Sequence, residues 1–136
     1  MKYKSIVSAC AALSTFFAVA FVSAPDVFTF NLFPSAEGLA LEVGIVKRYM
    51  MAAMALMGAV MIFCVREVSD VKSQCSILLG LGVGFTIPCA TLIVLVGSHN
   101  IPLQVVPVVA TGFAATMCYR ALFSLEPRQL VFSELG

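Results

Sequence analysis

Long apolar stretches separated by short polar ones dominate the order of residues along this chain. Four stretches come close to the roughly 20 mostly apolar residues that a helix needs to cross a bilayer. They cover about residues 5–24, 49–65, 75–96 and 105–123, and none contains Asp, Glu or Lys. Backbone polar groups in lipid must be bonded within their own element. The pattern therefore predicts an all-α membrane protein, a bundle of four transmembrane helices.

Composition supports lipid as the solvent. Of the 136 residues 61% are hydrophobic and 11% are charged, whereas soluble domains carry about 25% charged residues. A soluble chain of this length could not bury so much apolar surface. The net charge of +1 gives no basic face for nucleic acid. We expect one integral membrane domain over residues 1–136, with no separate soluble part.

The first apolar stretch has two interpretations. Lys2 and Lys4 precede it and it ends at Val22-Ser23-Ala24, which resembles a secretory signal with its cleavage site. Its length of about 20 residues suits a span better than a signal. We favour a retained first helix.

The positions of Lys and Arg predict the orientation, because these residues gather in short loops on the inner side. With the N-terminus inside, the inner side holds six of them and the outer side only Lys47 and Arg48. Both termini are therefore expected inside. The short stretch 66–72 makes the second and third helices antiparallel neighbours. The six inner residues are Lys2, Lys4, Arg66, Lys72, Arg120 and Arg128.

The longest stretch between spans covers residues 25–48, on the outer side. Residues 27–33 are too apolar to lie free in water, so they are expected at the membrane interface or against a partner. Ser35 is a candidate cap for a helix that begins near Ala36 and continues into the second span. An interfacial segment is the favoured interpretation; a lid or docking surface is the alternative.

Small residues recur at four-residue spacing in every predicted span. Transmembrane helices associate through such faces, because lipid tails are as apolar as Leu. The third span carries Gly80-xxx-Gly84 and also Pro88, which frees the carbonyl of Gly84. We expect a kink there, with Thr86 or Thr91 helping to satisfy that carbonyl.

Candidate chemistry is limited to soft ligands. Four cysteines, one in each span, lie toward the inner end and could together bind a soft metal. The alternative is that they pack as small apolar residues. The only His, His99, is expected in a solvated outer loop, and no cofactor is predicted. The four cysteines are Cys10, Cys64, Cys75 and Cys118.

Methionines form a stripe on the second span. Met50, Met54, Met57 and Met61 share one helical face. Met50-xxx-Met54 followed by Gly80-xxx-Gly84 resembles the paired motifs of eukaryotic copper transporters of the Ctr type. That resemblance covers these few residues alone, and the family has three spans and a Met-rich outer tail. Packing of the methionines between helices is the favoured interpretation.

The whole pattern also resembles small uncharacterised four-helix membrane proteins of bacteria. The features that carry the resemblance are a basic residue at Arg48, an Ala/Gly-rich span over residues 52–65, a charged turn over residues 66–72 and two further spans. This resemblance implies the topology and no activity.

Three functions remain open, in order of preference. The first is a non-catalytic accessory or structural subunit of a larger membrane complex, of respiratory or photosynthetic type, held to other transmembrane subunits or to its own copies by small-residue helix faces. The second is a small transporter or channel, for example for copper. The third is a membrane enzyme that acts on lipid or quinone.

Overall fold

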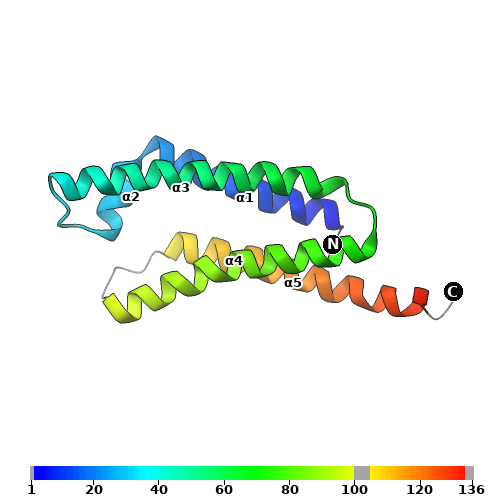
Figure 1. The fold of residues 1–136 in the computed structure, drawn as a ribbon. Helices are drawn as coiled ribbons and strands as arrows, with labels where there is room; N and C mark the ends of the chain where they lie inside the picture. The colour runs from blue at the N-terminus through cyan, green and yellow to red at the C-terminus, as the bar shows by residue number, and fades with distance from the viewer. Residues whose placement is uncertain (1, 100–104, 134–136) are drawn as a thin grey trace.

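The fold is a bundle of long helices (Figure 1). The computed structural model describes residues 2–99 and 105–133, with side chains for residues 2–97 and 105–125. Four of the described helices are long and apolar enough to cross a membrane, which confirms the predicted class of integral membrane protein. The helices in chain order are α1 (Tyr3–Ser23), α2 (Pro25–Leu32), α3 (Leu39–Cys64), η1 (Val65–Glu67), α4 (Val71–His99) and α5 (Val105–Ser133).

The second span starts about ten residues earlier than its hydropathy predicts. Helix α3 begins at Leu39, and its cap is Gly38 at φ +54°. Ser35 therefore does not cap this helix, and that prediction is wrong. The Gly38 carbonyl accepts the backbone N–H groups of Leu41 and Glu42. Glycine reaches this positive φ without the steric penalty that a side chain would bring.

The helices pack as two pairs, α1 with α3 and α4 with α5. Figure 1 shows one pair above the other. The buried core that the two pairs share, here called the junction, lies at the end of the molecule where α1 begins. Its members come from the first half of α1, the first half of α4 and the middle of α5: Tyr3, Ile6, Val7, Cys10, Leu78, Cys118 and Ala121.

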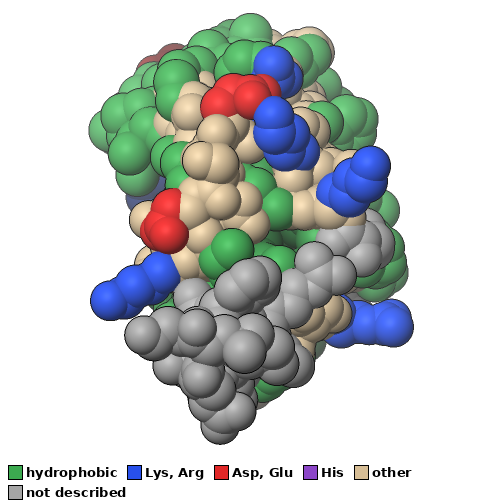
Figure 2. Space-filling view, turned by 90° about the vertical axis from the view of Figure 1, so that its right-hand side faces the viewer, with side chains coloured by type: hydrophobic (Ala, Val, Ile, Leu, Met, Phe, Trp, Pro, Cys, Tyr) green, Lys and Arg blue, Asp and Glu red, His purple; other side chains and the backbone are tan. Residues whose placement is uncertain are grey.

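Polar contacts surround the junction at the end of the bundle. The Tyr3 hydroxyl donates to the Val65 carbonyl at 2.8 Å, and Lys4 forms an ion pair with Glu67. Asp70 precedes α4, and its carboxylate accepts the Ser73 backbone N–H at 2.7 Å. The Ser73 hydroxyl also donates to it, and these bonds hold the pKa of Asp70 below its usual value. Figure 2 looks onto this end, where basic and acidic side chains gather between apolar flanks.

The apolar outer segment folds as the short helix α2, which packs on α3. Thr29 is its one buried residue, and it faces Gly44 of α3. Val27, Phe30 and Phe33 are exposed. The segment therefore has a face held against α3 and an apolar face that is open, as an element at the membrane interface would have.

We predict that Gly44→Ala weakens the fold although alanine favours helices. The new Cβ would collide with Thr29 Cγ2 and lie 3.2 Å from Thr29 Oγ1. Thr29 is stiff because it is β-branched and its hydroxyl is bonded to the Pro25 carbonyl. Overpacking of this kind destabilises by about 1–3 kcal/mol. Thermal unfolding in detergent and hydrogen exchange of α2 measure the loss.

Gly58→Ala on the same helix is the matched control. Nothing lies within 4 Å of its Cβ position, so it should gain about 0.5–1 kcal/mol from helix propensity. Equal stabilisation by both substitutions would contradict the packing of α2 on α3.

Candidate functional site: the groove between α4 and α5

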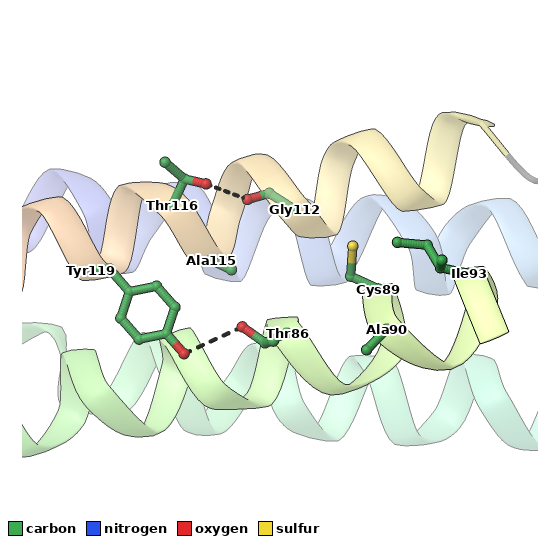
Figure 3. A pocket seen from close by; sticks show the side chains of 8 residues that line it. All are labelled: Thr86, Cys89, Ala90, Ile93, Gly112, Ala115, Thr116 and Tyr119. Atoms are coloured by element: carbon green, nitrogen blue, oxygen red, sulfur yellow. Dashed lines mark hydrogen bonds between the residues drawn. The ribbon is translucent and has the colours of Figure 1, made fainter.

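An open groove of about 320 Å³ lies between α4 and α5, in the central part of both spans (Figure 3). Its α4 wall includes Thr86, Cys89 and Ile93, and its α5 wall includes Gly112, Thr116 and Tyr119. None of the lining residues is Asp, Glu, Lys, Arg or His. The groove is therefore mainly apolar, with the hydroxyl groups of two threonines and a tyrosine and one thiol as its polar side-chain groups.

Two glycines lie where α4 and α5 approach each other. A Cβ on Gly82 would lie 2.8 Å from Tyr119 Cε1, closer than real side chains approach. The Tyr119 ring thus rests directly on the α4 backbone. A Cβ on Gly112 would lie 3.5 Å from Cys89 Sγ, which is ordinary contact. Gly82 is thus the position at which the approach of α4 and α5 requires glycine.

The hydroxyl groups of the groove donate their hydrogen bonds to other groups of the chain. Thr86 donates to the Gly82 carbonyl at 2.8 Å, and Thr116 donates to the Gly112 carbonyl at 2.8 Å. Tyr119 lies 3.3 Å from the Thr86 hydroxyl. Since Thr86 has only one proton, Tyr119 is the donor in that pair. The hydroxyl oxygens therefore offer lone pairs, and a ligand bonded to them would have to bring its own donor.

Pro88 lies inside α4 as predicted, but the hydroxyls near it do not act as expected. The Thr86 hydroxyl donates to the Gly82 carbonyl, and the Thr91 hydroxyl donates to the Ile87 carbonyl. In each case the acceptor is the carbonyl four residues earlier in the helix. Neither reaches the carbonyl of Gly84. The prediction that one of them satisfies the Gly84 carbonyl is therefore wrong. A threonine hydroxyl in a helix usually donates to the carbonyl of the preceding turn.

The structure brings together two of the four cysteines proposed as metal ligands. Cys10 Sγ and Cys118 Sγ lie 3.7 Å apart, and both side chains are buried. Cys64 is exposed and Cys75 is half-buried. Among the described residues no three His, Cys, Asp or Glu side chains form a group that could hold a metal ion. His99 is the last residue of α4, and its side chain lies outside the described part.

The methionine stripe faces outward. Met50 is 63% exposed and Met54 is 67% exposed, and Met57 and Met61 are exposed to a similar degree. The prediction that these methionines pack between helices is therefore wrong for the helices of this chain. The Met50–Met54 pair as a metal site stays a prediction.

Arg48 was predicted to lie in a loop. In the structure it is a buried residue of α3. It is 8% exposed, and one guanidinium nitrogen donates to the Phe28 carbonyl of α2 at 3.2 Å. The guanidinium carbon also lies 5.8 Å from the centre of the Phe21 ring of α1. Nε has no partner among the described residues. Arg48 therefore links α1, α2 and α3 at the far end of α1 from the junction.

Sequence reasoning did not identify Tyr119 and Thr86 as partners. In the sequence each is an ordinary helical residue. Their contact depends on which faces of α4 and α5 are turned toward each other. The signal that could have indicated the contact is Gly82, since a glycine between the members of Gly80-xxx-Gly84 faces the opposite side of the helix.

Comparison with known proteins gives no further guide to the site. No protein family, curated protein sequence or solved structure matches this chain.

We predict that Gly82→Ala disturbs the groove by displacing the Tyr119 ring. Overpacking should cost about 1–3 kcal/mol, against about 1 kcal/mol gained from helix propensity. Thermal unfolding in detergent measures the net loss. Gly97→Ala, on the same helix with nothing within 4 Å of its Cβ position, should not destabilise.

A double-mutant cycle tests the cause of that loss. In a Tyr119→Ala background the clash is gone, so Gly82→Ala should no longer destabilise. The same loss in both backgrounds would refute the contact between Tyr119 and Gly82.

Proposed function

We propose that this chain is a non-catalytic accessory or structural subunit of a larger membrane complex. The observation that carries the proposal is the face of α4 formed by Gly80 and Gly84. Nothing lies within 4 Å of the Cβ position of either glycine. The close approach that this face permits is not used by any described part of the chain.

The two faces of α4 serve different contacts. Gly82 is rotated by about 200° from Gly80, so it lies on the other side of the helix. That side packs on Tyr119 of α5. Helices in lipid gain association energy from close packing at small residues rather than from apolar burial. The Gly80 and Gly84 face is therefore suited to a helix from another subunit or a second copy.

The arrangement of the two pairs supports the same proposal. Among the described residues, their shared core lies at the junction, near the beginning of α1. Away from the junction the outer surfaces of α2 and α3 expose large apolar side chains, among them Phe30, Phe33, Met50 and Met54. These surfaces are available to lipid or to transmembrane partners.

The proposal includes an orientation, with antiparallel neighbouring helices and both termini on the inner side. The course of the chain in Figure 1, along α1 and back along α3, then along α4 and back along α5, supports antiparallel neighbours with both termini on the same side. The distribution of Lys and Arg supports the same assignment. Arg66 and Lys72 then lie on the inner side.

The groove favours a second candidate, a protein that binds a lipid-soluble molecule such as a quinol. Its volume of about 320 Å³ is at the lower end of ligand pockets. Its free oxygens accept hydrogen bonds, so the hydroxyl form of a quinone suits it better than the carbonyl form. The soft-metal alternative is less favoured, because Met50 and Met54 face outward and a metal path along them would run between chains.

We predict that Gly84→Ile removes the chain from its assembly. The protein is extracted in mild detergent from its native membrane, and its size and companions are measured by native separation and mass spectrometry. Isoleucine would keep a partner helix at a distance, and a loss of about 1.4 kcal/mol raises the dissociation constant of the assembly about tenfold. Gly58→Ile is the control and should leave the assembly intact, because Gly58 is open but has no second small residue four positions before or after it.

Migration of the parent chain alone would overturn the accessory-subunit proposal. In that case quinol found in the same peak would support the second candidate.

The orientation gives a separate prediction. A reporter that is active only on the inner side, fused after Gly136, should be active, and one fused after the first span at Ala24 should be inactive. An active outer-side reporter at the C-terminus would show that the orientation is inverted.

A further inference from the structure

Two cysteines from opposite ends of the sequence meet in the junction. Cys10 of α1 is 3% exposed and Cys118 of α5 is 0% exposed. Their sulfur atoms lie 3.7 Å apart, so that one thiol donates a hydrogen bond to the other. The two residues are 108 positions apart in the chain. Metal binding by a cluster of four thiols, which the sequence suggested, does not account for an isolated pair.

The position of the pair matters because it connects the two halves of the bundle. Cys10 belongs to the α1/α3 pair and Cys118 to the α4/α5 pair, and both are members of the junction. A covalent bond here would join the halves at the place where they share a buried core.

We propose that Cys10 and Cys118 are a redox-sensitive pair, which a hydroperoxide converts into a disulfide that fixes α1 to α5. The inference is independent of the proposed function, since it concerns how the two halves of this chain are held together.

The reaction balances with the hydroperoxide as the only oxidant. One sulfur attacks the peroxide oxygen, the O–O bond breaks, and a sulfenic acid and an alcohol or water form. The second sulfur then attacks the sulfenic sulfur, and water leaves as the S–S bond forms. The two sulfur atoms together lose two electrons, which the peroxide gains, and both thiol protons end in the released alcohol and water.

Burial decides which reagents can take part. Thiols in a buried, apolar environment react more slowly than exposed ones, and only a small neutral reagent reaches them. A small neutral peroxide crosses an apolar layer, whereas a charged thiol such as glutathione does not. The same burial that slows the reaction therefore also protects the disulfide from reduction once it has formed.

The test uses the full chain purified in mild detergent, reduced and then freed of reductant. It is exposed to hydrogen peroxide, the remaining thiols are alkylated, and the non-reduced digest is analysed by mass spectrometry. We expect a linked peptide pair that contains Cys10 and Cys118 and has lost two hydrogens. Cys118→Ser should abolish this linked pair, because serine has no sulfur with which to form it.

Cys89→Ser is the matched control, because Cys89 lies on α4 with its thiol directed to the Val108 carbonyl and should leave the link unchanged. Cys118→Ala repeats the test with an apolar side chain, and thermal unfolding verifies that each variant is folded. The exposed thiol of Cys64 reports that the peroxide is active. Oxidised Cys64 together with fully alkylated Cys10 and Cys118, or a link between other cysteines, would overturn the proposal.

Discussion

The structure depends on the junction, the small core at which the two helix pairs meet. Apolar burial contributes little to helix association in lipid, so close packing and polar contacts have to stabilise the association of the two pairs. The junction combines both: Cys10 and Cys118 pack across it, and Tyr3 donates to the Val65 carbonyl beside it. Because the shared core is confined to one end, the other surfaces of both pairs stay open to lipid or partners.

The glycines show where close packing has been used and where it is still available. Gly44 and Gly82 are positions where a Cβ would meet Thr29 and Tyr119, so each lets another element approach the backbone. Gly58, Gly80 and Gly84 have nothing within 4 Å of their Cβ positions. Glycine lowers helix stability by about 0.5–1 kcal/mol relative to alanine. An open pair at four-residue spacing is most easily understood if another helix uses it.

The sequence was sufficient for the number of spans and the class of the fold, because hydropathy over about 20 residues reflects the thickness of a bilayer. It was insufficient wherever rotation of a helix about its axis decided the outcome. The four cysteines were predicted to lie together because their positions along the spans give them similar depths in the bilayer. The faces on which they lie leave Cys64 exposed and bring only Cys10 and Cys118 into contact. The cap of α3 was predicted wrongly for another reason: Gly38 at positive φ precedes the first turn, and a glycine has no side-chain capping signal of the kind that Ser35 carries.

Arg48 shows how a charge can be accommodated in a chain that has little polar side-chain chemistry. Its nearest polar acceptor is a carbonyl dipole of α2 rather than a carboxylate, and its flat guanidinium lies near the Phe21 ring. Phe21 is close to the end of α1, whereas α3 starts nine residues before Arg48. The charge is therefore level with the end of α1 that lies away from the junction. There α2 covers it, and the same contact fixes an otherwise short helix to the bundle. The burial of Arg48 and the attachment of α2 to the bundle thus share one contact, the bond from the guanidinium group to the Phe28 carbonyl.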